Sequence, residues 1–329
     1  MKRVLVTGAA GFMGSHIVEK CLSMGFEVVS TDDLSGGFIE NVSKKSKFIL
    51  GDLKDPAFVT SLFKEEPFDY VYHLGAYAAE GLSHFIRRYN YETNLCASMN
   101  LINESVKGNV ACFVFASSIA VYGSNQLPMT EEMIPCPEDP YGISKYAVEL
   151  DLKSCREMFG MDFIIFRPHN VYGERQNISD KYRNVIGIFM NLIMQEKPLT
   201  IFGDGKQTRA FSHIDDVAPV IAKSPTVKTA MNQTFNIGAD KPYSILELAQ
   251  VIGSAFKKEP ILNFLPARNE VVHAFSDHSK VKGVFDTSEF IDLKTGIKRM
   301  KDFVLKQGPQ KPVIFDNLEI SKNLPLIWQ

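Results

Sequence analysis

The sequence predicts an α/β protein with a doubly wound parallel sheet, followed by a smaller lobe of mixed α/β structure. Three observations lead to this prediction. Short apolar runs alternate with helical patterns through the first half of the chain, a glycine-rich loop joins the first run to the first helix, and the alternation weakens after about Val171. Strands that are apolar along their whole length and separated by helices indicate a parallel sheet covered on both faces.

Six strands and four helices are expected in the first half. The strands are expected at residues 2–7, 27–31, 47–50, 69–74, 110–116 and 162–166, and the helices at 12–24, from 56 onward, 82–106 and 140–159. Gly25 directly follows the first helical pattern, which is a signal for a helix C-cap.

The second half is expected to be less regular. Helices are expected at residues 181–195, 244–257, 277–283 and 287–306, with a short strand and turn at 199–205. Ser244 stands three residues before Glu247, which predicts a capping box at the start of its helix. The tail from residue 307 to 329 contains prolines and is expected to lie irregularly over the surface.

Composition narrows the functional classes. The 329 residues carry 36 basic and 38 acidic side chains, a formal charge of −2 that gives no electrostatic reason to expect nucleic acid or an anionic membrane as a partner. No apolar run reaches the roughly 18 residues of a membrane-spanning helix. The apolar run before the glycine loop is also shorter than the core of a signal peptide, so a cytoplasmic protein is expected.

The cysteines predict neither a disulfide framework nor a zinc site. Their number is odd and no two form a CxxC pair, so they are expected to be reduced, buried and small hydrophobic residues, and no metal is expected. They are Cys21, Cys96, Cys112, Cys136 and Cys155.

The glycine loop predicts a site for a dinucleotide. Gly8 permits a tight exit from the strand, Gly11 permits close approach of a pyrophosphate to the backbone, and Gly14 permits the helix to pack on the sheet. Phe12 and Met13 begin a helix whose free N–H groups face the phosphates. The position of the loop between a strand and a helix is the context that this motif requires.

Acidic residues after the second and third strands favour NAD over NADP. Asp32 and Asp33 follow the glycine loop by about 20 residues, where a carboxylate accepts hydrogen bonds from the adenosine ribose and repels a 2′-phosphate. Asp52, with Leu53 after it, follows the third strand and is within reach of the adenine edge. Each of these aspartates is also compatible with a plain turn.

Ser118, Tyr141 and Lys145 are predicted to form a catalytic group that oxidises a hydroxyl. Tyr141 and Lys145 are one helical turn apart and therefore share a face. Ser117 and Ser118 follow the strand expected at 110–116, at the edge of the sheet where ligands bind in open α/β folds. A neighbouring ammonium and a positively charged nicotinamide both favour the phenolate form of a tyrosine, which makes Tyr141 a candidate base. Ser118 would hold the substrate hydroxyl.

The ordered motifs resemble the extended short-chain dehydrogenase/reductase family, in particular its NAD-dependent nucleotide-sugar epimerases and dehydratases. They are TGAAGFMG, HLGA at 73–76, Asn94 within YETNL, SSIAVYG at 117–123, PYGISK at 140–145, RPHNVYG at 167–173, FGDGKQTRAFSHIDDVA at 202–218 and PARNEV at 266–271. The resemblance implies an NAD-binding Rossmann domain over residues 1–171 and a nucleotide-sugar-binding lobe over 172–329, with some elements around 208–237 returning to the first domain.

The resemblance also implies roles for individual residues. Tyr141 is the base, Lys145 tunes it and binds the nicotinamide ribose, and Ser118 orients the hydroxyl. Further cofactor contacts are implied for Leu74, Gly75, Ala76, Asn94, Ser117, Pro168 and His169. Substrate contacts are implied for Asn170, Asn184, Val185, Phe202, Arg209 and Arg268. A guanidinium binds phosphate oxygens through a bidentate fork, which suits the two arginines to a diphosphate.

Within the family, the pair after the catalytic serine favours a sugar 4-epimerase similar to UDP-glucose 4-epimerase. Relatives that eliminate water or carbon dioxide carry an acid there, whereas this chain has Ile119 and Ala120. Ala274 is implied to stand beside the sugar and would leave room for a bulky substituent. The alternatives are a nucleotide-sugar 4-reductase consuming NADPH, an epimerase acting at another carbon, a dehydratase, and a non-enzymatic dinucleotide-binding regulatory protein.

A homodimer is also expected. In relatives the helices that correspond to residues 82–106 and 141–159 pair into a four-helix interface. The apolar residues that fit such a face, although core packing explains them equally well, are Leu95, Met99, Ile102, Val148, Leu152 and Cys155.

Overall fold

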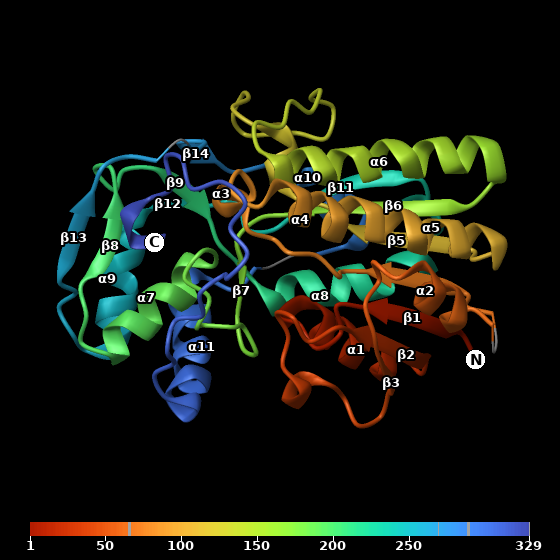
Figure 1. Ribbon diagram of the computed structural model, residues 1–329, viewed down its shortest axis with the longest axis horizontal. Helices are drawn as coiled ribbons and strands as arrows, with labels where there is room; N and C mark the ends of the chain where they lie inside the picture. The colour runs from red at the N-terminus through yellow and green to blue at the C-terminus, as the bar shows by residue number, and fades with distance from the viewer. Residues whose placement is uncertain (65–66, 269, 288–289, 329) are drawn as a thin grey trace.

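A parallel sheet and the helices around it form the larger part of the molecule (Figure 1). The computed structural model describes residues 1–64, 67–268, 270–287 and 290–328. Within these residues the sheet has seven strands in the order β11-β6-β5-β4-β1-β2-β3. Their bounds are β1 (Arg3–Thr7), β2 (Glu27–Asp32), β3 (Lys47–Leu50), β4 (Tyr70–His73), β5 (Cys112–Ala116), β6 (Asp162–Pro168) and β11 (Gln233–Ile237). Every neighbouring pair is parallel, which confirms the predicted doubly wound sheet.

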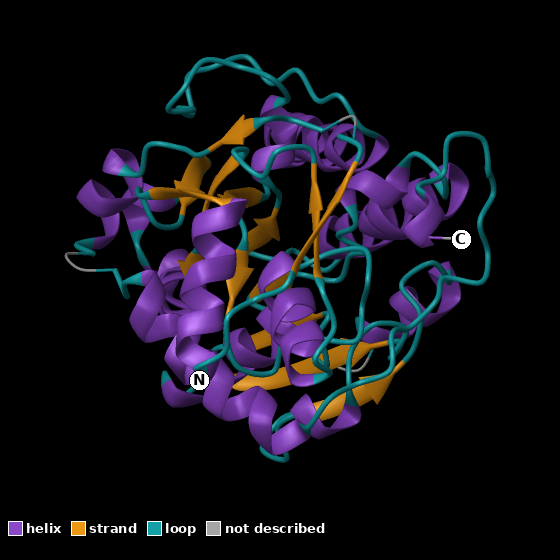
Figure 2. Cartoon of the chain, turned by 90° about the vertical axis from the view of Figure 1, so that its left-hand side faces the viewer, coloured by secondary structure: helices purple, strands orange, loops and turns teal. Residues whose placement is uncertain are grey.

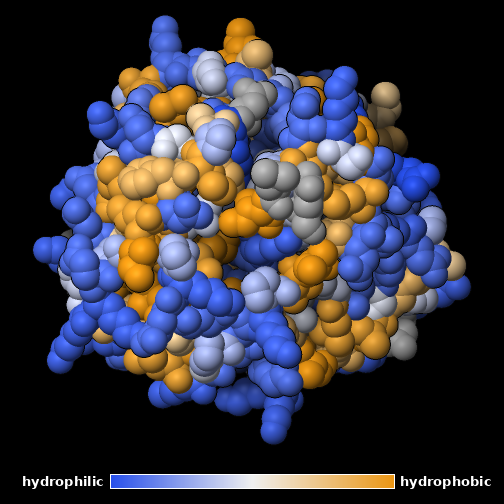
Figure 3. All heavy atoms as spheres, turned by 60° about the vertical axis from the view of Figure 1, so that its left-hand side comes forward, coloured by the Kyte–Doolittle hydropathy of each residue, from blue (hydrophilic) through white to orange (hydrophobic). Residues whose placement is uncertain are grey.

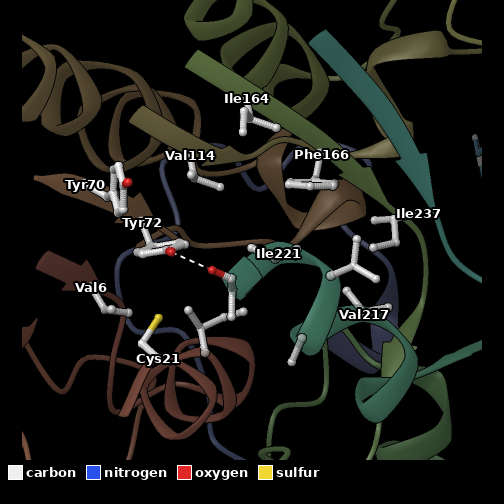
Figure 4. Packing of buried hydrophobic residues seen from close by; sticks show 14 of the residues in the cluster. Val6, Cys21, Tyr70, Tyr72, Val114, Ile164, Phe166, Val217, Ile221 and Ile237 are labelled. Carbon is white, nitrogen blue, oxygen red and sulfur yellow. Dashed lines mark hydrogen bonds between the residues drawn. The ribbon is translucent and has the colours of Figure 1, made fainter. Parts of the chain in front are cut away.

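Helices cover both faces of the sheet. On one face, α1 (Phe12–Ser23), α8 (Ile214–Lys223) and α10 (Ser279–Phe285) bury a cluster that includes Ile17, Ile221 and Phe285. The Tyr72 hydroxyl crosses this cluster and donates to the Ala222 carbonyl at 2.6 Å (Figure 4). On the other face, α2 (Pro56–Leu62), α5 (Ala97–Lys107) and α6 (Pro140–Phe159) bury a second cluster. This two-sided burial explains why the central strands carry almost no polar residues.

The second lobe, which faces the viewer in Figure 2, consists of helices and short strands. It has its own hydrophobic core. The elements around it are α7 (Val185–Met194), β8 (Leu199–Phe202), α9 (Ile245–Phe256), β13 (Leu262–Leu265) and α11 (Leu293–Gln307). The capping box predicted at Ser244 and Glu247 is present at the start of α9. Short strands link the lobes: β7 (Val171–Tyr172) pairs with β10 (Ser212–His213), and β9 (Thr208–Ala210) lies between β12 (Pro242–Ser244) and β14 (His273–Ala274).

The single long helix predicted over residues 82–106 is wrong. The chain forms α3 (Glu80–Ser83), α4 (Arg87–Tyr91), a π-helical turn Glu92–Cys96 and then α5. The cause is the C-terminal tail: the Phe85 carbonyl accepts hydrogen bonds from the Glu319 and Ile320 amides. The Glu319 carboxylate in turn accepts from the Arg88 and Tyr89 amides at 2.8 and 2.9 Å. A residue about 230 positions away therefore caps α4, and no local pattern announces it.

Other helix bounds also differ from the prediction. α7 begins at Val185 rather than at residue 181, because Asn184 has the left-handed φ of 65° and Asp180 organises the preceding residues by accepting from the Tyr182 amide. α10 spans Ser279–Phe285 rather than 277–283. α11 begins only at Leu293, after the Asp292 cap. Residues 288–289 of the helix predicted from 287 lie outside the described part of the chain.

Two cysteines differ from the prediction. Cys21, Cys112 and Cys155 are buried as expected, whereas Cys96 and Cys136 are exposed, and all five are free. Cys96 ends the π-helical turn and Cys136 lies in a loop, so neither faces the core. Among the described residues, no helix combines the length and apolar character that crossing a membrane requires.

Candidate active site

A deep cleft runs between the two lobes. It extends from the glycine loop, along the carboxyl ends of the strands, to the loop that carries Arg268. Its volume of about 1470 Å³ exceeds the roughly 300–1,000 Å³ of an ordinary small-molecule pocket, so it has room for two ligands side by side. The surface of the molecule mixes hydrophilic and hydrophobic residues and is hollowed near the centre of the face in Figure 3.

Nearly all of the predicted site residues line this one cleft. They are Gly8, Gly11, Phe12, Met13, Gly14, Asp32, Asp33, Asp52, Leu53, Leu74, Gly75, Ala76, Ser117, Ser118, Tyr141, Lys145, Pro168, His169, Asn170, Asn184, Val185, Phe202, Arg209 and Arg268, together with Ala274. Asn94 is placed differently. It is buried outside the cleft wall, where its amide binds both the N–H and the carbonyl of Tyr77 and thereby holds the loop after β4.

The glycine loop forms a cradle that side chains would fill. Gly8 has a φ of +66°, and a Cβ on Gly14 would lie 2.0 Å from the Gly8 carbonyl oxygen. Gly11 is the N-cap of α1 and has no side chain to occupy the first amides of the helix. These amides and the positive end of the helix dipole therefore remain available to a phosphate. The cradle fits the pyrophosphate of a dinucleotide.

The two aspartates after β2 differ in their surroundings. The Asp32 carboxylate accepts hydrogen bonds from the Ala10 amide at 3.0 Å and from the Leu34 amide at 2.8 Å, so it fixes the glycine loop as well as facing the cleft. Burial raises the pKa of Asp32, an effect that these backbone donors oppose. Asp33 is exposed and accepts from the Ser35 amide and hydroxyl. Both residues line the same cleft as the glycine loop.

Tyr141 and Lys145 are positioned by the start of α6. Asp139 caps this helix through the Gly142 amide at 2.9 Å, and Pro140 occupies its first turn. The Lys145 Nζ lies 5.8 Å from the centre of the Tyr141 ring and donates to the Ala116 carbonyl at 2.9 Å. Ser118 follows β5 and accepts from the Ala120 amide at 3.1 Å. The three side chains that the sequence singled out therefore meet at the carboxyl edge of the sheet.

Burial shifts the pKa values of Tyr141 and Lys145. It lowers the pKa of Lys145 to about 7 and raises the pKa of Tyr141 above its usual value, with the Ser118 hydroxyl opposing the latter effect. In the ligand-free protein the phenol is therefore protonated, and the lysine amine is partly neutral at pH 7. A phenolate at Tyr141 requires another positive charge in the cleft.

The pKa of Lys145 leads to a prediction for chemical labelling. Only the neutral amine reacts with an acylating reagent, so acetylation of Lys145 by a small anhydride is expected to reach half its maximal rate near pH 7. Peptide mass spectrometry across pH 6–10 measures the rate, with the exposed Lys153 on the same helix as an internal control. A Lys145 rate that still rises steeply above pH 9 would contradict the lowered pKa.

A buried ion pair between Arg167 on β6 and Glu149 on α6 stabilises the elements that carry the site. The Arg167 guanidinium donates twice to the Glu149 carboxylate, at 3.0 and 2.5 Å, and both side chains are at most 2% exposed. Arg167 also donates to the Tyr122 hydroxyl at 2.7 Å. The Ser117 hydroxyl donates to Glu149 at 2.5 Å, which ties the residue before Ser118 to α6. This network fixes β5, β6 and α6 relative to one another.

The two arginines predicted to bind the diphosphate line the cleft, and both have partners within the chain. Arg209 donates to the carbonyls of Val271 and Val272 at 2.6 and 2.9 Å. Arg268 donates to the Glu270 carboxylate at 2.8 Å, and its guanidinium lies 4.0 Å from the centre of the Phe202 ring. The Arg268 guanidinium therefore covers one face of the Phe202 ring. Residue 269 of the PARNEV motif lies outside the described residues.

His169 is held in a buried histidine pair. Its Nδ1 lies 3.0 Å from the Ala210 carbonyl oxygen and its Nε2 lies 2.9 Å from the Nε2 of His278. Burial lowers the pKa of His169 to about 3, so the ring is neutral at physiological pH. Asn170 has a φ of +40° and donates to the same Ala210 carbonyl at 3.2 Å.

The cleft wall contains residues that the sequence did not single out. Glu80 and His84 come from α3 and its C-cap, and Trp328 comes from the tail. The Trp328 side chain is buried and lies 5.4 Å from the Arg268 guanidinium. None of these residues belongs to a recognisable motif, so sequence reasoning had no signal for them.

Known proteins share this sequence and this fold. Residues 4–238 match the NAD dependent epimerase/dehydratase family. A UDP-glucose 4-epimerase of Mycolicibacterium smegmatis is 31% identical over 309 residues, covering 92% of this chain and 98% of that protein. The structure of a Thermotoga maritima UDP-glucose 4-epimerase with UDP-glucose has a TM-score of 0.86 at 30% identity and covers 93% of this chain and 99% of that one. A Thermus thermophilus UDP-glucose 4-epimerase in complex with NAD also has a TM-score of 0.86 at 30% identity, covering 92% and 98%.

These likenesses agree with the geometry of the cleft. The family match includes the glycine cradle, Ser118, Tyr141 and Lys145, and the similar solved structures extend over both lobes. The resemblance and the cofactor inferred from the sequence are thereby confirmed. The chain belongs to the NAD dependent epimerase/dehydratase family, and it is an enzyme of the epimerase type with NAD as its cofactor.

Proposed function

We propose that this protein interconverts the C4 epimers of a UDP-hexose through a transient 4-keto sugar. The observation that carries the proposal is the meeting of Ser118, Tyr141 and Lys145 at one end of a cleft whose other end holds Arg209 and Arg268. Such a cleft can hold the diphosphate at one end while the sugar reacts at the other. The enzymes named UDP-glucose 4-epimerase among its relatives support this choice.

Each side chain has a defined task in this reaction. NAD bound along the glycine loop supplies a hydride acceptor and afterwards the hydride donor. Tyr141 would accept the proton of the sugar 4-hydroxyl during oxidation and return it to the same oxygen during reduction. Ser118 holds that hydroxyl, and the Lys145 ammonium favours the phenolate. Arg209 and Arg268 hold the diphosphate while the keto sugar rotates and presents its opposite face.

The surroundings of Ser118 favour epimerisation over elimination. The two residues after it, Ile119 and Ala120, are apolar, so no carboxylic acid stands there to protonate a leaving hydroxyl. Oxidation followed by reduction at C4 needs no such acid, because the proton and the hydride both return to the sugar.

A substrate panel tests the proposal. The purified protein is incubated with UDP-glucose, UDP-N-acetylglucosamine and UDP-glucuronate without added reductant, and the products are followed by proton NMR. The expected result is a C4-inverted sugar formed with no net oxidation or reduction of cofactor. Net consumption of NADPH would indicate a 4-reductase, inversion at another carbon would indicate a different epimerase, and loss of water would indicate a dehydratase. Absence of turnover on every nucleotide sugar would favour the regulatory alternative.

We also propose that the protein forms a homodimer through α6. Of the six apolar residues expected at the interface, Ile102, Val148, Leu152 and Cys155 are buried in the core of one chain, whereas Leu95 and Met99 are only partly buried against that core. Other apolar residues of α6 remain exposed, at 42% for Ile143 and 49% for Leu150. These two are seven residues apart and so share one helix face.

Replacing Leu150 by glutamate tests this assembly. The wild-type protein is expected to show twice its 36.9 kDa chain mass in light scattering at micromolar concentration. Leu150→Glu is expected to show the mass of one chain, because a charge would be buried without a partner in the interface. Leu305→Glu, which makes the same substitution at an exposed leucine of α11, serves as the control. A wild-type monomer would contradict the proposal.

A further inference from the structure

An unpartnered carboxylate stands in the wall of the cleft. Glu80 begins α3, and its side chain is open to the cleft that Tyr141 and Arg268 also line. Across the described part of the chain, no hydrogen bond or ion pair engages the Glu80 carboxylate. Glu80 is exposed to the open cleft, although the cleft walls surround it, so its carboxylate is available to a ligand.

Glu80 lies between the two ends of the proposed substrate site. The charges that act on it come from Asp139 at the start of α6, from Arg209 on β9, and from Arg268 and Glu270 in the loop before β14. Its own charge acts on Tyr141. A hexose placed between Tyr141 and the arginines would lie in the cleft that Glu80 also lines, within range of its charge.

We propose that Glu80 is a specificity-determining residue that selects neutral hexoses, whose hydroxyls it binds, and rejects hexuronates, whose C6 carboxylate it repels. This inference rests on the proposed function and adds the class of sugar. A carboxylate has only acceptors and can take hydrogen bonds from two adjacent sugar hydroxyls. A second carboxylate in the same cleft would face the like charge of Glu80, which Arg209 and Arg268 offset only in part.

The protonation of Glu80 makes the selection depend on pH. Burial and the negative charges of Asp139 and Glu270 raise its pKa to about 7, and the two arginines act in the opposite direction. Glu80 is therefore mainly ionised at pH 8 and mainly neutral at pH 6 in the ligand-free protein. His84 also lines the cleft near Glu80, so the comparison below uses a Glu80 variant at both pH values.

Glu80→Gln tests the inference through kinetics. It keeps the shape of the side chain and removes the charge, so the ratio of kcat/KM for UDP-glucuronate to that for UDP-glucose is expected to rise by roughly 30-fold or more at pH 8. Glu259→Gln removes an exposed charge from the second lobe, far from the cleft lining, and is expected to leave the ratio unchanged. An unchanged ratio in Glu80→Gln, in an enzyme that still epimerises UDP-glucose, would overturn the inference.

Binding measurements separate this inference from the proposed reaction. Calorimetric titration of each UDP-sugar into Tyr141→Phe and into Tyr141→Phe/Glu80→Gln needs no turnover. The first protein is expected to prefer UDP-glucose strongly at pH 8 and weakly at pH 6, and the second is expected to show the same small preference at both. A preference that is independent of pH and of Glu80 would refute the role of Glu80. Failure of both proteins to bind any UDP-sugar would instead refute the proposed function.

Discussion

Tyr141→Phe is expected to lower the rate of epimerisation by about 10³–10⁴-fold, the usual share of a general acid–base group in a rate enhancement. The substitution removes one oxygen and keeps the ring in its buried position on α6. Without the phenol, the group that the proposed mechanism uses to accept the proton of the 4-hydroxyl is gone, while the Lys145 Nζ still donates to the Ala116 carbonyl. The initial rate of C4 inversion, followed by NMR, measures the effect.

The result is informative only if the Tyr141→Phe protein remains folded and keeps its bound NAD. Its bound NAD, its affinity for UDP and its melting temperature are expected to match the wild type, since the hydroxyl serves the chemical step and not the cradle. A loss confined to KM would instead make Tyr141 a binding residue. A variant with full turnover would remove the tyrosine from the mechanism and reopen the regulatory interpretation.

Arg167→Met is expected to lower the free energy of unfolding by about 3–5 kcal/mol, the cost of removing one partner of a buried ion pair. The change would leave the Glu149 carboxylate charged and fully buried, with Ser117 as its remaining donor. It would also take from the Tyr122 hydroxyl the guanidinium that donates to it. Urea unfolding followed by circular dichroism measures the loss.

Two further variants decide whether burial causes this loss. Lys258→Met breaks the exposed pair with Glu196 and is expected to cost less than about 1 kcal/mol. The double variant Arg167→Met/Glu149→Met removes both buried charges and is expected to recover part of the stability lost in the single variant. Equal losses from Arg167→Met and Lys258→Met would contradict the assignment of Arg167 as a buried stabilising partner.

The sequence predicted best where structure is set locally. The start of α6 is an example: Asp139 caps the helix, Pro140 occupies its first turn, and Tyr141 and Lys145 follow with fixed spacing. The glycine loop is another, because the tight turn at Gly8 and the close contact at Gly14 permit almost no other residue. Structure at such positions can be predicted from the sequence, because the backbone geometry there permits only one residue type.

The sequence failed where distant segments meet. The helix expected over 82–106 is broken by Glu319, and the apolar face of α6 expected to bind another chain is partly occupied by its own core. Glu80 had no motif to mark it, and its importance comes only from the arginines and Tyr141 that the fold places around it. Tertiary contacts of this kind leave no periodic trace along the chain.

The return of the chain to the sheet has a consequence for dissecting this protein into pieces. β11 is the edge strand beside β6, although 64 residues separate the end of one from the start of the other, and Phe235 stacks on Phe166 at 5.7 Å between ring centres. A fragment that stops near residue 171 would leave β6 as a bare, apolar rim able to pair with other copies. Such a truncated half is expected to precipitate during synthesis, so cofactor affinity should be studied on the whole chain.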